Sequence, residues 1–467
     1  MKKLSLALPF FIVLTGCVVG PNYKRPQVAV PGEFRGAETP ATNTAVSLAD
    51  TKWPELFKSE PLNKLISTAL QDNFDVRIAA ERVQQARAQL GVTRADQFPF
   101  VDAQGQFNAQ RQSTLGSFRF LPAGTNLSSS YTQAGAALSW ELDLWGRLRR
   151  LTEAARAEYL ASEEGRRAVI VSLISDVTTA YFQLLELELE LDVSRKTRDI
   201  AADSLKLVQL RRERGAASGL DVRQAEQLQF SATAQIEAVE RGIAQSENLL
   251  SLLLGQPPSD QPRGAKLDEI PVPPAVPAGL PSALLERRPD IRAAEQTLIA
   301  ANARIGAARA LYFPQLSLTA FAGAQSRALT EIATAPARVY SAAPSALLPI
   351  FRAGQIRNQV RLTEAQQREM VVRYQQAIYN ALREVSDALA GYTRTRNQRE
   401  QQEQLVRTLD DSVRLSTLRY KGGLDSYLQV LDSQRNLFAG ELTLARLRLE
   451  ERLAVVQLYR ALGGGWS

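Results

Sequence analysis

The sequence contains no histidine and only one cysteine among its 467 residues. Without imidazole side chains, general acid–base catalysis by histidine and the catalytic triads that require it are excluded. With one cysteine and no histidine, zinc sites of the usual cysteine and histidine type are excluded. A single cysteine also excludes an intramolecular disulfide. We therefore expect a protein that has no catalytic residues and is not an enzyme.

Methionine and net charge are also scarce. Met1 and Met370 are the two methionines, so the chain has no obvious set of soft ligands for metal export. A formal net charge of +7 is a weak argument for nucleic-acid binding, and no nucleic-acid partner is expected. Hydrophobic side chains make up 45% of the chain, which is ample for a large folded core.

The N-terminus has the layout of a secretory signal peptide over residues 1–16. Two lysines precede an apolar run, and small residues precede Cys17. The sequence Leu14-Thr-Gly-Cys17 resembles the lipobox of bacterial lipoproteins, in which the cysteine is acylated and becomes the first residue of the mature chain. This resemblance implies a covalent lipid on Cys17 and no other cofactor. Val18 favours the outer membrane within that class of signals. The alternative is an ordinary buried cysteine.

We find no predominantly apolar stretch of about 18 residues after the signal peptide, so no transmembrane helix is expected. Lipid chains alone would make the protein peripheral. Whether the chain also crosses the membrane depends on its strands.

Two segments of the chain repeat internally. Residues 75–99 align without a gap onto 290–314, and residues 204–255 align onto 412–463. The strongest matches are shared glycines and Phe-Pro pairs: Gly91/Gly306, Phe98/Phe313, Pro99/Pro314, Gly215/Gly423 and Gly255/Gly463. The chain is therefore interpreted as a tandem duplication.

A proline-rich stretch separates the two copies. Residues 257–281 contain eight prolines, which is incompatible with a helix or a central strand and predicts an extended linker. The predicted organisation is a signal peptide, a lipidated extended segment, a first repeat, this linker and a second repeat. Their bounds are 1–16, 17–61, 62–256, 257–281 and 282–467.

Each repeat is predicted to contain a β-hairpin, at about 100–144 and about 315–351. A helix ends at the Phe-Pro pair before each hairpin, because the residue before proline avoids the helical region. Apolar and polar residues then alternate strictly, as expected for strands with one wet face. The last strand, near 340–350, is less regular.

A long helical hairpin follows each β-hairpin, at about 147–254 and about 355–462. The first helix of each hairpin runs for 68 residues without proline, over 147–214 and 355–422. Such a helix would be roughly 100 Å long if continuous. Apolar residues in steps of four and three predict coiled-coil seams: Leu173, Val177, Ala180, Leu184, Leu187 and Leu191, then Ile378, Leu382, Val385, Leu389 and Tyr392.

Four amphipathic strands of about 9 to 12 residues are long enough to cross a bilayer when they are tilted. Four strands cannot close into a barrel, and an open edge is not tolerated in lipid. A membrane interpretation therefore requires at least two, and more plausibly three, copies of the chain. A water-soluble sheet that packs on helices is the alternative that alternation leaves open.

Several motifs, in order along nearly the whole mature chain, resemble the TolC-like outer-membrane efflux channels, in particular their lipoprotein branch. Besides the lipobox, they are Gly20-Pro-Asn-Tyr-Lys-Arg-Pro26, Leu142-Asp-Leu-Trp-Gly146, Leu285-Glu-Arg-Arg-Pro-Asp-Ile291, Tyr312-Phe-Pro314, Leu348-Pro-Ile-Phe-Arg-Ala-Gly354 and Arg419-Tyr-Lys-Gly-Gly-Leu-Asp-Ser-Tyr-Leu-Gln-Val-Leu-Asp432.

This resemblance implies a mainly helical homotrimer in the bacterial outer membrane. Its expected architecture is a twelve-stranded β-barrel continuous with a twelve-helix α-barrel of coiled-coil hairpins that crosses the periplasm. Its expected function is the exit duct of a tripartite efflux system, which passively conducts drugs or other toxic small molecules. The implied partners are outer-membrane lipid, a periplasmic adaptor and an inner-membrane pump of the proton-driven RND type.

The resemblance also implies a gate at the periplasmic tips of the helical hairpins. Leu428 and Asp432 match the leucine and aspartate that narrow the aperture in the lipoprotein branch. Asp221 and Tyr420 match positions whose hydrogen bond links the two hairpins in the closed state. Gln429 stands where other relatives carry a second acidic ring. The alternatives are an ordinary seam residue for Leu428 and a solvated helix face for Asp432.

The tips are also the expected contacts for the adaptor. The candidate residues are Gly215, Gly219, Gly422 and Gly423, with the basic side chains of Arg211, Arg212, Arg214 and Lys421 beside them. The alternative is that the charged side chains of the tips are solvated and bind no partner. The polar stretch 393–404 lacks apolar seam residues, so we expect the coiled coil to open there against an equatorial domain.

A periplasmic adaptor lipoprotein is the rival interpretation, because adaptors also combine a lipobox with a helical hairpin. Adaptors have one such hairpin between lipoyl-like and β-barrel segments, whereas this sequence predicts two hairpins and duplicated strand pairs. The exported substrate is not determined by the sequence.

Overall fold

The computed structural model describes residues 18–36, 48–113, 126–272, 279 and 281–464. The predicted signal peptide and Cys17 lie outside these residues. The described chain forms two compact units, and both draw on both sequence repeats. The first comprises 1–26, 84–161 and 295–373, and the second comprises 27–83, 162–294 and 374–467.

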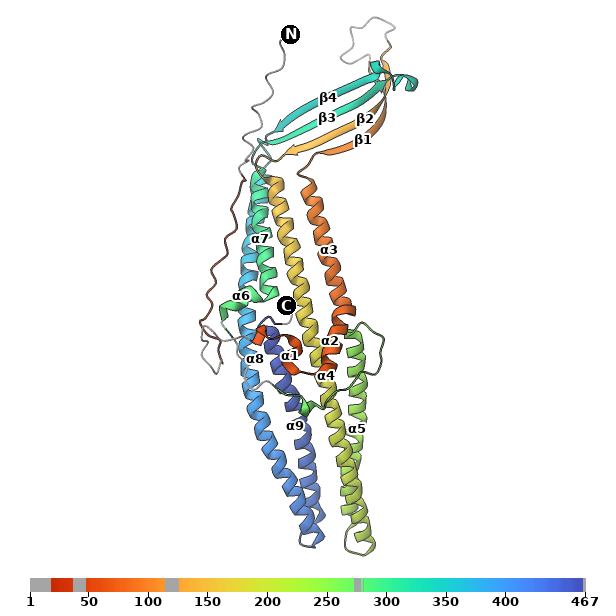
Figure 1. Ribbon diagram of the computed structural model, residues 1–467, viewed down its shortest axis with the longest axis vertical. Coiled ribbons are helices and arrows are strands. Elements are labelled where there is room, and N and C mark those ends of the chain that lie inside the picture. Colours follow the sequence, from red (N-terminus) through yellow and green to blue (C-terminus); the bar gives the residue numbers. More distant parts are fainter. Residues whose placement is uncertain (1–17, 37–47, 114–125, 273–278, 280, 465–467) are drawn as a thin grey trace. The chain divides into compact units, whose positions relative to one another are not determined.

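Long helices and a four-stranded sheet account for most of the described chain (Figure 1). The helices are α1 (Trp53–Phe57), α2 (Glu60–Asp72), α3 (Phe74–Ala95), α4 (Arg147–Glu213), α5 (Gly219–Leu253), α6 (Leu284–Arg287), α7 (Pro289–Ala310), α8 (Gln355–Lys421) and α9 (Tyr427–Ala461). The strands are β1 (Phe100–Arg111), β2 (Ser128–Leu142), β3 (Gln315–Ser326) and β4 (Arg338–Leu347).

The sheet of the first unit is antiparallel throughout, in the order β1-β2-β3-β4. Because β2 belongs to the first repeat and β3 to the second, the sheet joins the two repeats. Ala136 lies opposite Ala103 on β1 and Ala322 on β3. The predicted boundary between repeats is therefore not a boundary between compact units, since strand pairing requires a partner from the other repeat.

The register gives the sheet one apolar and one polar face, as the alternation predicts. Val101, Leu138 and Ala320 lie in one row of the apolar face, and Gln106, Gln133 and Gln325 lie in one row of the polar face. The less regular strand β4 places Pro344 opposite Leu318. Within one chain β4 is an edge strand with a single neighbour, the position in a sheet where proline is tolerated.

The N-terminal motif 20–26 lies along α7 in the first unit. Gly20 approaches Gly306 so closely that a Cβ on Gly20 would be 2.4 Å from the Cα of Gly306. The Asn302 side chain donates to the carbonyl of Pro21 at 3.0 Å, and Arg25 donates to Glu295 at 2.6 Å. These contacts explain why this motif begins with glycine.

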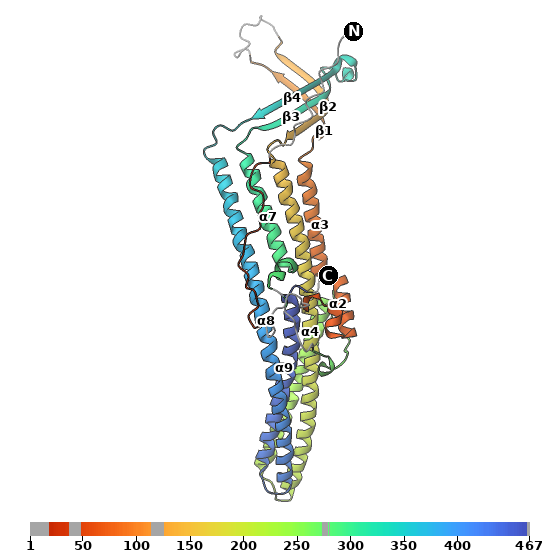
Figure 2. The same cartoon turned by 60° about the vertical axis from the view of Figure 1, so that its left-hand side comes forward.

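The second unit contains α5, α9 and the parts of α4 and α8 that begin at residues 162 and 374, which together form two helical hairpins. Figure 2 shows α4, α8 and α9 from a second side. α4 and α8 are each continuous over 67 residues, as predicted. Leu173, Val177, Ala180 and Leu184 of the predicted seam are 5% exposed or less, so this face of α4 is a core seam.

An apolar stretch of 18 residues does follow the signal peptide, in α4, contrary to what the sequence analysis found. An 18-residue window of this helix has a mean hydropathy of 1.6 with at most two charged residues, so it passes the length and composition test for a membrane span. Of this window, 61% is buried inside the protein. Burial of this extent is typical of a core helix, because the apolar residues face protein rather than lipid.

The predicted extended segment 17–61 also contains helix. A 3₁₀ turn at Leu48–Asp50 precedes α1, which has proline in its first turn, and α2 begins at Glu60. Phe57 at the end of α1 packs edge-on against Phe182 of α4, with ring centroids 4.8 Å apart. Burial of this aromatic pair stabilises a helix that is too short to be stable alone.

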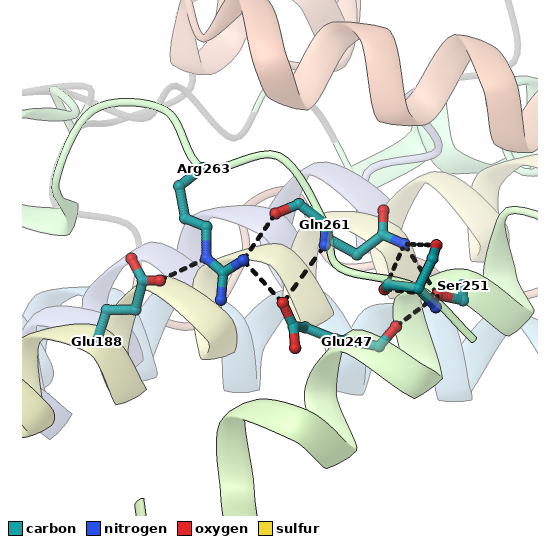
Figure 3. A network of polar contacts seen from close by, with 6 residues as sticks. Glu188, Glu247, Ser251, Gln261 and Arg263 are labelled. Carbon is teal, nitrogen blue, oxygen red and sulfur yellow. Dashed lines mark hydrogen bonds and ion pairs between the residues drawn. The ribbon is translucent and has the colours of Figure 1, made fainter. Parts of the chain in front are cut away.

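The proline-rich linker is docked on the helices of the second unit rather than free of them (Figure 3). Arg263 bridges Glu188 of α4 and Glu247 of α5, at 2.5 and 2.8 Å. The buried Gln261 side chain donates to the Ser251 hydroxyl at 2.8 Å. The prolines keep the linker from forming a helix of its own. Side-chain hydrogen bonds hold it against α4 and α5 instead.

The polar stretch 393–404 of α8 lies in the second unit and makes ion pairs with α9. Arg399 pairs with Glu403 at 2.9 Å and with Glu451 of α9 at 2.8 Å. The buried Arg452 donates to the linker carbonyls of Leu267 and Ile270, at 2.5 and 2.8 Å. Ion pairs and linker contacts therefore replace the apolar seam in this part of α8.

Two buried carboxylates, Glu186 and Glu190, lie one turn apart on α4 in the second unit. Arg446 of α9 donates to Glu190 at 3.0 Å. Burial, together with the neighbouring charge of Glu190, raises the pKa of Glu186 to about 8.

We expect Gln261→Ala to lower the free energy of unfolding of the second unit by about 1–3 kcal/mol, because the buried Ser251 hydroxyl loses one of its two donors and the buried amide contacts of Gln261 are lost. Thermal unfolding measures this loss, and limited proteolysis should cut the linker faster. Gln256→Ala is the control, since the Gln256 side chain is exposed at the start of the same segment. Equal effects of the two variants would contradict the anchoring role of Gln261.

Stability should also fall as pH rises from about 5 to about 8. In this window folded Glu186 holds a proton that the unfolded chain, with a pKa near 4.5, releases. The stabilising contribution is therefore complete in acid and is lost as pH rises through the folded pKa. Glu186→Gln should flatten the dependence of the melting temperature on pH, whereas Glu237→Gln on the exposed face of α5 should not.

Candidate functional site

The helical hairpins of the second unit turn at two similar tips. In the first, the amides of Gly215 and Ala216 donate to the carbonyls of Arg212 and Arg211, at 2.9 and 2.8 Å. In the second, Gly423 and Leu424 make the equivalent bonds to Tyr420 and Arg419, at 3.0 Å each. This pattern is the Schellman motif, which ends a helix with a residue in the left-handed region.

Both tip glycines have positive φ, +73° at Gly215 and +75° at Gly423. Any side chain at these positions would strain the backbone. The other two predicted adaptor contacts differ from them. Gly219 is the first residue of α5, and Gly422 lies in the turn before Gly423 with no positive φ. Gly215 and Gly423 therefore have a structural reason to be glycine.

The helices that leave the two tips begin differently. The Asp221 carboxylate accepts from the amide and the hydroxyl of Ser218, at 2.7 and 2.9 Å, and the Ser218 hydroxyl caps the Asp221 amide. This capping box fixes the start of α5. In the second tip Arg419 pairs with Asp425 at 2.6 Å, which holds the pKa of that carboxyl below its usual range.

The predicted hydrogen bond between Asp221 and Tyr420 is not formed. The Tyr420 hydroxyl is buried without a hydrogen-bond partner among the residues that the structure describes. The Asp221 carboxylate is already engaged as a helix cap, because Ser218 offers it two donors within three residues of sequence. The two hairpins are therefore linked by other contacts.

An apolar cluster packs the two hairpins together beside the tips. Tyr420 of α8 and Tyr427 of α9 pack edge to face, with ring centroids 5.5 Å apart. The other buried members are Ala201, Val208, Val222, Ala225, Leu228, Val430 and Leu431. Burial raises the pKa of Tyr427 to about 12, so this phenol stays neutral at physiological pH.

Arg211 forms a polar link between the hairpins at the tips, and the sequence analysis did not assign it this role. Its guanidinium lies 4.4 Å from the centroid of the Tyr420 ring and donates to the Tyr420 carbonyl at 3.0 Å. The duplication aligns Arg211 with Arg419, which instead pairs within its own tip. The sequence contains a sign of this difference. The aligned arginines Arg211 and Arg419 are followed by different residues, Arg212 and Tyr420.

Leu428 and Asp432 lie four residues apart on the exposed face of α9. Leu428 is 50% exposed, and Asp432 is exposed and accepts a hydrogen bond from Asn436 at 3.3 Å. The neighbouring Tyr427 and Leu431 are buried in the apolar cluster. Leu428 is therefore not a seam residue of this chain.

The described part of the chain contains no group of three carboxylate, thiol or imidazole side chains placed to bind a metal ion. The tips thus present an exposed apolar side chain, carboxylates and guanidinium groups. Such an arrangement can narrow or filter a passage.

Comparison with known proteins agrees with this geometry. Residues 65–256 and 280–464 match the family model described as outer membrane efflux protein, which covers both repeats. The chain is 40% identical over 473 residues to the solvent efflux pump outer membrane protein SrpC of Pseudomonas putida, across 100% of this chain and 99% of that one.

Two further comparisons extend this result. The probable outer membrane lipoprotein SilC of Salmonella typhimurium is 37% identical, across 100% of this chain and 99% of that one. The crystal structure of the open state of the MtrE outer membrane channel of Neisseria gonorrhoeae is similar with a TM-score of 0.85 and 33% identity, covering 97% of this chain and 99% of that chain.

The match over both repeats does not support the rival interpretation as a periplasmic adaptor, for which one helical hairpin was expected. The resemblance inferred from the motifs is confirmed, as are the tandem organisation and the location in the outer membrane. Both repeats, the relatives over their full lengths and the fold lead to one conclusion: this chain belongs to the outer membrane efflux protein family.

Proposed function

We propose that three copies of this chain form the outer-membrane exit duct of a tripartite efflux system. One observation carries the proposal: the sheet ends in two open edges, β1 and β4, although one of its faces is apolar. Unpaired backbone groups are not tolerated in lipid, so the edges need partners from other copies.

Three copies of the sheet give a barrel of twelve strands, with β4 of each copy paired to β1 of the next. The apolar face then meets lipid, and the polar face, which carries Gln106, Gln133 and Gln325, lines a water-filled lumen. The helical hairpins of the three copies form the proposed twelve-helix α-barrel. A dimer would close only eight strands, whose interior is filled by side chains, whereas the twelve strands of a trimer leave room for a lumen.

The duct itself is proposed to be passive and without enzymatic activity. Transport energy would come from an inner-membrane pump of the RND type through a periplasmic adaptor. The adaptor would contact the tips at Gly215, Gly219, Gly422 and Gly423, where the backbone is exposed. The relative SrpC is named for solvent efflux, and small organic compounds are the cargo that we propose for this chain.

The gate is proposed at the tips, with Leu428 and Asp432 on the lumen side of α9. By threefold symmetry, Leu428 would form a ring that excludes water, and Asp432 would place three carboxylates around the axis. The exposure of both side chains in one copy supports this assignment. Arg211, rather than a hydrogen bond of Tyr420 to Asp221, would hold the closed state.

A covalent lipid on Cys17 is proposed as a second membrane anchor, with no other cofactor. The relative SilC is named as a lipoprotein, which supports the assignment. Since the barrel alone would hold the protein in the membrane, the lipid would not be required for insertion.

We expect Cys17→Ser to abolish acylation and still give trimers in the outer membrane. The trimers should migrate as one species in unheated gels, separate into monomers on heating and conduct ions in planar bilayers. The unsubstituted chain is the control in each measurement. A soluble periplasmic monomer in the Cys17→Ser strain would sink the barrel assignment.

We also expect Asp432→Ala and Arg211→Met to raise the single-channel conductance in planar bilayers. The first substitution removes the carboxylate ring, and the second removes the bond between the hairpins while it keeps an unbranched side chain. At about 1.5–3 kcal/mol for a hydrogen bond with a charged donor, loss of the Arg211 link should favour opening about tenfold or more.

Tyr420→Phe separates the two possible links between the hairpins. Its hydroxyl has no partner within the described residues, so its removal should leave the conductance unchanged. An increase with Tyr420→Phe and none with Arg211→Met would show that the hydroxyl, not the guanidinium, holds the gate. Arg223→Met on the exposed start of α5 is the matched arginine control.

A further inference from the structure

A cavity with a mixed lining in the first unit lies between α7, α8 and the ends of β3 and β4 at Gln315 and Leu347. This cavity has a volume of about 460 Å³, which is ample for a small organic molecule. Its polar lining includes three guanidinium groups, Arg147, Arg304 and Arg352. None of these residues belongs to the gate or to the tips.

The cavity opens on the polar side of the sheet. Gln315 and Leu347 line it and lie opposite each other in the register, in the same alternating set as Ser317 and Thr319. The proposed lumen is on that side. A molecule in the cavity would therefore be in contact with the duct and not with lipid.

The orientation of α7 also places the cavity on the side of the proposed lumen. Arg304 and Ala308 line the cavity, whereas Gly306 between them contacts the N-terminal segment at Gly20. Positions two residues apart on a helix differ by about 200° in direction. The N-terminal segment and the cavity thus lie on opposite sides of α7, as expected if the segment runs outside the duct.

The charges in the cavity are of one sign. Glu141 holds Arg147 at 2.6 Å, and Glu158 pairs with Arg304, but neither carboxylate lines the cavity. Arg352 is exposed in the loop before α8, and it takes part in no ion pair within the described parts of the chain. The guanidinium groups of Arg147 and Arg304 are thus held by carboxylates outside the lining, whereas that of Arg352 is available to an anion from the cavity.

The floor of the cavity is apolar. Its apolar lining residues include Leu151 of α4, Ala307 and Ala308 at the end of α7 with Leu311 directly after it, and Ile356 of α8. A purely anionic ligand such as phosphate would leave these apolar side chains exposed to water, whereas an uncharged hydrocarbon would leave Arg352 without a counter-charge.

We propose that the cavity is a transient binding site for permeants that carry a carboxylate or sulfonate beside an apolar body. The inference rests on the proposed function and specifies its cargo: the duct wall would retain anionic amphiphiles at three equivalent sites per trimer. Arg352 is the main contact for the anion, Arg304 is the second, and the apolar floor holds the body of the molecule. Cationic and uncharged compounds pass without binding there.

The probe for this site is tritiated cholate, below its micellar concentration, with the full-length trimer in lipid nanodiscs and empty nanodiscs as blank. We expect saturable binding of one cholate per chain. Arg352→Gln should raise the dissociation constant about tenfold, the factor that one hydrogen bond with a charged group contributes. Octyl glucoside, which is uncharged, should not compete.

Arg357→Gln is the matched control. Arg357 is exposed on α8 two residues from Gln359, which lines the cavity, so it removes the same charge from another side of the helix. Equal effects of the two substitutions, or cholate uptake that does not saturate above the blank, would overturn the proposal. Arg304→Gln should weaken binding as well, and an unchanged dissociation constant in both Arg304→Gln and Arg352→Gln would also overturn it.

The same preparations separate this inference from the proposed function. Trimers that conduct ions in planar bilayers but bind no cholate would leave the duct intact and refute the cavity site. Chains that neither form trimers nor conduct would refute the duct itself, whatever they bind.

Discussion

The pairing of β2 with β3 is the interaction on which the first unit depends. It joins strands from the two sequence repeats in a register that keeps apolar residues on one face, with Ala136 opposite Ala322 and Trp140 opposite Leu318. A shift of one residue would move each apolar side chain to the polar face. The register therefore fixes both the membrane face of the sheet and the orientation of the residues below it, including Gln315 and Leu347 at the cavity.

The second unit uses polar contacts where a simple coiled coil would use an apolar seam. The linker binds through Arg263 and Gln261, and Arg452 holds the carbonyls of Leu267 and Ile270. Buried ion pairs are weak evidence for stability, but they are costly to break because one charge is left alone. Such contacts hold a proline-rich segment in one position, because hydrogen bonds and ion pairs depend on direction. The hydrophobic effect is not directional and would not fix that position.

The two tips show how a duplicated sequence acquires different contacts. Gly215 and Gly423 keep the same left-handed turn, because the Schellman motif depends on backbone geometry alone. The aligned residues Arg211 and Arg419 differ in partner, and only Arg211 joins the two hairpins. The two tips therefore differ in their contacts although their backbones turn in the same way.

Sequence periodicity alone determined the helices, the strands and the duplication, because steps of 3.6 and of two residues are local properties of the chain. The glycine tips followed from the duplication, and the family followed from motifs in order. The tertiary structure alone decided that the linker is docked, that Asp221 caps its own helix and that Arg211 stacks on Tyr420. It also brought Arg147, Arg304 and Arg352 to one cavity, although 157 residues separate the first two. These contacts join residues that are far apart in sequence, and no local pattern records which of several arginines will reach a given carbonyl or carboxylate.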